Sequence, residues 1–199
     1  MREFVYLSNK ARTSGNFNVN DLMSAGRMDI ACHVLINALF ISHKVRENTK
    51  LHFVFNGPPD PPKHLLLFPN GKKSVGSITL SKKDVANLIR KMLFKYNPRK
   101  ERTIIEEGFE VEKKSFFSLI DTLKSEGKDL FVLDEKGEDI RKIEISSNPV
   151  FILGDATGFN KKELKKLKTF AIPVSVGPKI YFASQVVTIV NNELDRRGV

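Results

Sequence analysis

The feature that most constrains the fold of this 199-residue chain is a regular alternation of helical and extended patterns after residue 115. Short apolar runs favour strands, and segments with helical apolar spacing separate them. Strand–helix alternation is typical of a parallel sheet with helices on its faces. The predicted elements are helix 115–126, strand 129–133, a polar loop 134–139, strand 150–153, a short Lys-rich helix capped by Asn160, strand 169–176 and helix 183–196.

The first half of the chain has a less regular pattern. A long helix is expected from a cap at Asn20 or Asp21 to about Val45, and a second helix begins at Ser81 and ends near Tyr96. The predicted strands are 2–7, 51–55 and 65–68, with a rigid Pro-rich loop at 56–62. We therefore expect one α/β domain over residues 1–199, with a mostly parallel sheet flanked by helices.

Several classes of protein are excluded by pattern and composition. No apolar run approaches the roughly 20 residues of a membrane helix, and the first residues do not resemble a signal peptide. The single cysteine, Cys32, cannot form an intrachain disulfide, which favours a reducing cytoplasm. The four histidines lack zinc-ligand spacing, so no metal is expected. Motifs of P-loop enzymes and hydrolases are also absent.

The formal charge of +10 is concentrated in two short stretches. Residues 81–102 contain eight basic and two acidic side chains, and residues 160–168 contain five lysines and one glutamate. The remaining sequence is neutral. Composition alone leaves two interpretations equally open, namely solvated helix faces or binding of an anionic partner such as nucleic acid.

Three predicted strands end in sequences suited to a ligand site. These ends are Val132-Leu133, Leu153-Gly154-Asp155 and Ser175-Val176-Gly177-Pro178. Ligands of parallel sheets bind beyond the carboxyl ends of strands, and glycines allow close approach of the backbone. Single glycines after strands also make ordinary turns, and without further information that interpretation is favoured. The absence of GxGxxG argues against an ordinary dinucleotide site.

The same segments resemble a known family. Residues 150–155, 174–185 and 188–196, together with Arg2-Glu3-Phe4 and the segment 24–29, are similar to SPOUT methyltransferases, and most closely to archaeal tRNA pseudouridine-54 N1-methyltransferases. The resemblance extends over nearly the full length of the chain. It implies S-adenosyl-L-methionine as methyl donor, a C-terminal trefoil knot, a homodimer and the T-loop of tRNA as substrate. General folding rules do not predict a knot.

The resemblance also assigns a cofactor pocket. The implied cofactor-binding residues are Leu133, Gly154, Val176, Gly177, Pro178, Lys179, Ile180, Tyr181 and Val186. This chain departs from the family where many relatives have Ala-Ser-His followed by Cys, because it has Ala183-Ser184-Gln185-Val186. Neither a thiol nor a histidine base is therefore required there, and Val186 is expected to make apolar contact.

The predicted reaction needs a base for the N1 proton of pseudouridine, and a carboxylate is the natural candidate. Asp155, Asp29 and Asp21 are the candidates, although Asp155 could equally cap the turn that follows it. Arg27 is expected to bind a tRNA phosphate in preference to pairing only with a carboxylate such as Asp29. Tyr181 is a candidate for stacking on a base or on adenine.

Alternative functions remain open from sequence. One is the related methylation of pseudouridine in ribosomal RNA. Another is non-catalytic RNA binding through the basic helix faces, and a third is methylation of a protein or small molecule. The preferred prediction is a methyltransferase acting on N1 of pseudouridine in the T-loop of tRNA.

Overall fold

The computed structural model describes residues 1–42, 44–69 and 81–199. One eight-stranded sheet has the order β10-β8-β9-β1-β4-β5-β7-β6. Neighbouring strands from β10 to β4 are parallel, and those from β4 to β6 are antiparallel. The strands are β1 (Arg2–Ser8), β4 (Thr49–Phe55), β5 (Lys63–Leu67), β6 (Arg102–Glu106), β7 (Phe109–Glu112), β8 (Asp129–Asp139), β9 (Pro149–Gly154) and β10 (Ile172–Ser175). The predicted α/β class with a mostly parallel sheet is confirmed.

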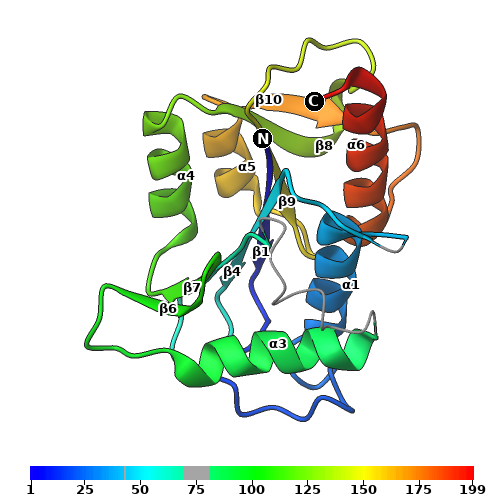
Figure 1. The fold of residues 1–199 in the computed structure, drawn as a ribbon. Coiled ribbons are helices and arrows are strands. Elements are labelled where there is room, and N and C mark those ends of the chain that lie inside the picture. The colour runs from blue at the N-terminus through cyan, green and yellow to red at the C-terminus, as the bar shows by residue number, and fades with distance from the viewer. Residues whose placement is uncertain (43, 70–80) are drawn as a thin grey trace.

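Helices cover both faces of the sheet (Figure 1). One face packs against α1 (Met28–Leu39), α3 (Lys82–Lys95) and α6 (Ala183–Arg197), and the other against α4 (Phe116–Ser125) and α5 (Lys161–Leu167). Successive strand residues point to opposite faces. In β1, for example, Phe4 and Tyr6 join the first core and Val5 and Leu7 join the second. Burial on both faces explains why the central strands are continuous apolar runs.

The helix caps follow the sequence signals in three cases. Ser81 accepts a hydrogen bond from the Asp84 N–H at the start of α3, and Ser115 accepts one from the Ser118 N–H at the start of α4. Asn160 begins α5 with a complete capping box that includes Glu163. These side chains satisfy backbone donors that the first turn of a helix leaves free.

The prediction of one long helix from residue 20 to residue 45 is wrong at both ends, because α1 covers only Met28–Leu39. Neither Asn20 nor Asp21 caps a helix, and α1 begins only at Met28. Gly26 and Arg27 both have left-handed backbone conformations, with φ of 73° and 64°, which no helix can continue through. The helix ends at Leu39 because Phe40 is extended and starts the two-residue strands β2 (Phe40–Ile41) and β3 (Lys44–Val45).

Two further expectations also need correction. The segment 134–139, predicted as a polar loop, belongs to β8. Its pairing with β10 shifts register, so that Pro173 lies opposite Val132 and the next residue, Val174, lies opposite Glu138. The hairpin of β6 and β7 had no counterpart in the predicted elements.

Candidate functional site

The carboxyl ends of three adjacent parallel strands bring together a group of polar side chains. Ser8 ends β1, Asn56 follows β4 and Asp155 follows β9. The Ser8 hydroxyl donates to Asp155 Oδ2 at 3.3 Å, the Asn9 N–H donates to the same oxygen at 3.0 Å, and Asn56 Nδ2 donates to Asn9 Oδ1 at 3.1 Å. This is the edge of a parallel sheet where ligands bind.

Asp155 also organises the loop that follows it. The Thr157 N–H and hydroxyl donate to its Oδ1 at 2.9 and 2.6 Å, and the Gly158 N–H donates to its main-chain oxygen at 2.8 Å. The turn-capping role considered for Asp155 is therefore present. A carboxylate has about four acceptor sites, and the chain supplies four donors, two on each oxygen.

Arg27 and Asp29 form a bidentate ion pair at the start of α1. Arg27 Nε and Nη2 donate to the two carboxylate oxygens at 3.0 and 3.1 Å. Burial tends to raise the pKa of Asp29, but the hydrogen bonds and charge of Arg27 outweigh it and lower the pKa below its usual value. Arg27 is 44% exposed, and its guanidinium carries further N–H groups, beyond the two that bind Asp29, with which it can bind an anion.

Tyr6 on β1 lies close to all three predicted catalytic residues. Burial raises the pKa of its hydroxyl above the usual value, and the charges of Asp155 and Asp29 act in the same direction. Ser8 and Arg27 oppose them. The structure thus brings Asp155, Asp29 and Arg27 to one region around Tyr6, whereas Asp21 is an exposed residue before the helix.

The segment between β1 and α1 is fixed by two glycines. A side chain at Gly26 would lie 1.7 Å from the Lys10 carbonyl oxygen, and one at Gly57 would lie 2.2 Å from the same atom. Thr13 ties the segment to the Pro-rich loop, because its hydroxyl donates to the Gly57 carbonyl and accepts from the Asp60 N–H. This packing holds Asn9 and Arg27 near the strand ends.

The predicted cofactor residues lie within β8, at the end of β9, after β10 and at the start of α6. Leu133, Val176 and Val186 are partly buried and pack against the same core. A side chain at Gly154 would lie only 3.0 Å from the Gly158 backbone, so only glycine fits there without a shift. Gly177, at φ +155°, lies against the Tyr181 ring, whose hydroxyl oxygen would be 3.1 Å from a Cβ at residue 177.

The backbone of this region offers open hydrogen-bond donors. Residues 176–182 form neither helix nor strand. Within the described parts of the chain, the N–H groups of Lys179, Ile180 and Tyr181 donate to no other protein group. Gln185 has a structural role instead of a catalytic one, because its Oε1 accepts from the Phe182 N–H at the start of α6.

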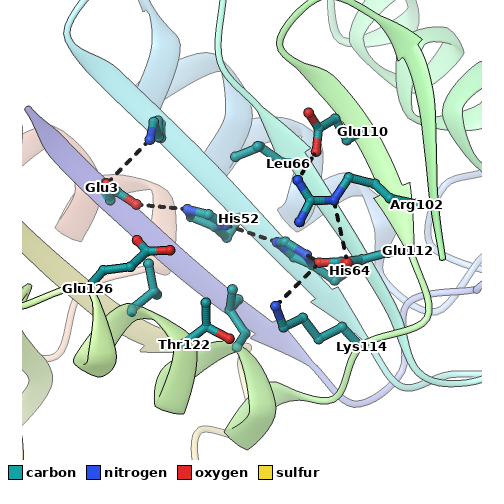
Figure 2. Close-up of a pocket in the computed structure, with 13 residues that line it drawn as sticks. Glu3, His52, His64, Leu66, Arg102, Glu110, Glu112, Lys114, Thr122 and Glu126 are labelled. Atoms are coloured by element: carbon teal, nitrogen blue, oxygen red, sulfur yellow. Dashed lines mark hydrogen bonds and ion pairs between the residues drawn. The ribbon is translucent and has the colours of Figure 1, made fainter.

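A second polar cluster lies between the sheet and α4, and it was not anticipated from sequence (Figure 2). Four buried groups form one chain: Glu3 Oε2 lies 3.0 Å from His52 Nε2, His52 Nδ1 lies 2.9 Å from His64 Nε2, and His64 Nδ1 lies 2.8 Å from Glu112 Oε1. A cavity of about 190 Å³ opens beside it.

Cations flank both ends of this chain of four residues. Lys128 and Lys50 lie 2.7 and 3.8 Å from Glu3, and Lys114 and Arg102 each lie 3.7 Å from Glu112. Burial tends to raise the pKa of Glu3, but hydrogen bonds from His52 and Lys128 lower it to about 2. Burial lowers the pKa of His64 to about 4, against the opposing effect of Glu112.

Proton counting constrains the state of this chain of four residues. Three hydrogen bonds need three protons, but two neutral imidazoles between two carboxylates have only two. With both rings neutral, one of the three contacts therefore lacks a proton, and the lowered pKa of His64 disfavours a second proton on that ring. No sequence pattern indicated this arrangement, because His52 and His64 meet only through the antiparallel pairing of β4 with β5.

The structure also bears on metal binding and on membrane insertion. Among residues 1–42, 44–69 and 81–199, no group of three or more His, Cys, Asp or Glu side chains is arranged to hold a metal ion. In the same residues, every helix is too short or too polar to span a bilayer.

Comparisons with known proteins identify the family of this chain. The whole chain, residues 1–199, matches the model of a family described as "Putative SAM-dependent RNA methyltransferase". A tRNA (pseudouridine(54)-N(1))-methyltransferase of Pyrococcus abyssi is 34% identical, with 100% of each chain covered. The enzyme of the same description from Methanosarcina mazei is 38% identical, covering 98% of this chain and 92% of its own.

The fold also has a structural neighbour over its full length. A crystal structure of Archaeoglobus fulgidus Nep1 bound to S-adenosylhomocysteine superposes with a TM-score of 0.65, covering 100% of this chain and 99% of the other at 15% identity. At that identity the likeness concerns the fold alone. With full-length relatives above 30% identity, the chain belongs to the SAM-dependent RNA methyltransferases and, among them, to the tRNA (pseudouridine(54)-N(1))-methyltransferase family.

Proposed function

We propose that this protein methylates N1 of pseudouridine 54 in tRNA at the carboxyl ends of β1, β9 and β10. The observation with most weight is the packing at the strand ends, where Asp155 accepts hydrogen bonds from Ser8 and Asn9. The next residue, Lys10, packs against Gly26, which precedes Arg27. Membership of the family over the full chain supports the same reaction.

The cofactor pocket is proposed at Leu133, Gly154, residues 176–181 and Val186. The open N–H groups of residues 179–181 and the close backbone approach at Gly154 fit a ligand held largely by main-chain contacts. When bound, S-adenosylmethionine supplies an activated methyl group. The protein's part is then to place the two reactants and to accept the N1 proton.

Asp155 is proposed as the base. Of its four donors, the Ser8 hydroxyl at 3.3 Å makes the longest contact, which leaves Oδ2 the more available oxygen. A hydroxyl can rotate and accept instead of donating. Ser8 can therefore accommodate a protonated Asp155, and the backbone N–H of Asn9 keeps the carboxyl group in place.

Arg27 is proposed to bind a phosphate next to the target base. Asp29 orients its guanidinium through two hydrogen bonds, and nearly half of the arginine side chain is exposed to solvent. Asp29 is then a positioning residue, because its own acceptors are engaged by Arg27.

We further propose one knotted domain that acts as a homodimer in the cytoplasm. The strongly exposed Ile180 and Phe182, on either side of Tyr181, support a partner chain near the cofactor pocket. The knot is what the resemblance to SPOUT methyltransferases implies. The single cysteine fits a reducing compartment.

The decisive experiment uses labelled S-adenosylmethionine with paired transcripts. One tRNA transcript has pseudouridine at position 54, and the matched control has uridine, whose N1 is bonded to ribose and has no proton. Labelling of the pseudouridine transcript alone is expected. Equal labelling of both transcripts, or preference for a pseudouridine-containing ribosomal RNA fragment, would overturn the proposal.

A further inference from the structure

An exposed aromatic ring lies in the middle of the basic face of α3. Phe94 is 63% exposed, although six apolar residues on the opposite face of the helix are buried. Positions three and four residues apart share a helix face. Lys91 and Arg90 therefore lie beside Phe94, and Lys83 lies further along the same face.

The ring is backed by the segment that leads to Arg27. A side chain at Gly15 would lie 2.4 Å from Phe94 Cδ2 and 2.7 Å from the Arg90 carbonyl oxygen, so the backbone of residue 15 lies directly against the ring. The same segment is joined to the turn before Arg27, because the Arg12 N–H donates to the Ala25 carbonyl at 3.3 Å. Phe94 thus has one side supported by this segment and 63% of its surface exposed.

The surroundings of Phe94 select between possible partners. An apolar protein interface would need neighbouring apolar side chains, but the neighbours of Phe94 on this face of α3 are cationic or amide groups. Unpaired RNA bases stack on aromatic rings while Lys and Arg bind the flanking phosphates. Charge complementarity therefore favours single-stranded RNA over a second copy of this chain.

We propose that Phe94 is a stacking platform for one unpaired base of the RNA substrate, with Lys83, Arg90 and Lys91 binding the adjacent phosphates. This inference rests on the proposed function and adds a specific substrate contact outside the cofactor pocket. It assigns an RNA contact to the basic face of α3.

The test measures tRNA affinity of Phe94→Ala, Phe94→Tyr and wild type over a series of salt concentrations. Phe94→Ala is expected to weaken binding about 5- to 100-fold, and Phe94→Tyr to restore it. The slope of log affinity against log salt should stay unchanged in Phe94→Ala, because no charge is lost. In Lys91→Ala the slope should decrease by about 0.7 to 0.9.

Ile104→Ala is the matched control, since Ile104 is an equally exposed apolar residue (68%) on the edge strand β6. Wild-type affinity in Phe94→Ala would overturn the inference. Loss of a dimer in Phe94→Ala with unchanged RNA affinity would also overturn it, in favour of a chain–chain contact. The proposed function fails separately, if wild type does not methylate the pseudouridine transcript.

Discussion

His52 Nδ1 lies 2.9 Å from His64 Nε2, and this contact links a strand of the parallel sheet to a strand of its antiparallel extension. The rings stack with centroids 5.2 Å apart. The outer nitrogen of each ring faces a carboxylate oxygen, that of Glu3 for His52 and that of Glu112 for His64. Protonation of both histidine rings would bring two positive charges into contact in a buried site.

Acid should destabilise the fold through His64. The pKa of His64 is about 4 in the folded protein, below the usual 6.5. As pH falls from 6.5 to 4, His64 therefore binds a proton in the unfolded chain but stays neutral in the folded chain. We expect the free energy of unfolding to fall over this window, by at most about 1.4 kcal/mol per pH unit for this group. Between pH 4.5 and 2 the unfolded chain also binds a proton at Glu3, whose folded pKa is about 2, and this adds to the decline.

The variant His64→Gln tests this linkage by denaturant unfolding at pH 4, 5, 6 and 7. It should be less stable than wild type at pH 7, yet show a flatter decline between pH 6.5 and 4. His33→Gln is the matched control, because His33 is exposed on α1 and outside the chain of four residues. If the free energy of unfolding of His64→Gln falls as steeply as that of wild type, the pKa of His64 is not lowered in the folded protein.

Replacing Asp155 with asparagine should separate chemistry from cofactor binding. Loss of a general base costs about 100- to 10,000-fold in kcat, while the affinity for S-adenosylmethionine should change little. The amide also disturbs the contacts with Thr157, so Thr157→Val serves as control: it removes the 2.6 Å hydroxyl donor and keeps the carboxylate. Equal losses of kcat in both variants would indicate that Asp155 acts only by closing the turn.

Arg27 should show opposite effects on stability and on RNA binding. Among the described residues it is the one non-glycine residue with a positive φ, which costs about 1 kcal/mol or more. Arg27→Gly removes that strain and also removes an ion pair that is 44% exposed at Arg27 and 15% exposed at Asp29. We expect thermal stability equal to or above wild type, with weaker tRNA binding and normal cofactor binding. A variant that binds tRNA as tightly as wild type would remove the phosphate role.

The central strands could be predicted because their residues are buried on both faces. Phe131, Phe151 and Ile152 have almost no exposed surface, and such strands give continuous apolar runs in sequence. The start of α1 could not be predicted, because the helical pattern continues upstream and is interrupted by the left-handed conformations of Gly26 and Arg27. A single glycine within a helical pattern is a weak sign of such a conformation, and an arginine gives no sign of it.

The candidate site was predictable only in part, for a related reason. Asp155 and the glycines after β9 and β10 stand at strand ends, where sequence pattern and resemblance both direct attention. Asn9 and Asn56 were not identified, because their contact depends on the register of β1 and β4. The pairing of His52 with His64 depends likewise on the register of β4 and β5. The pattern of apolar residues in the two strands does not predict that register.

Substitution of Gly177 should weaken cofactor binding, whereas substitution of a comparable glycine elsewhere should lower only stability. In Gly177→Ala the new Cβ meets the Tyr181 hydroxyl at 3.1 Å and the backbone is strained at φ +155°. If residues 176–181 hold S-adenosylmethionine, its Kd should rise about 5- to 100-fold, matching about 1–3 kcal/mol of strain. Gly198→Ala is the control, since φ +71° is also strained there but nothing lies within 4 Å. Calorimetric titration should find a normal Kd for Gly198→Ala despite a lower Tm, and equal weakening in both variants would exclude a local role for Gly177.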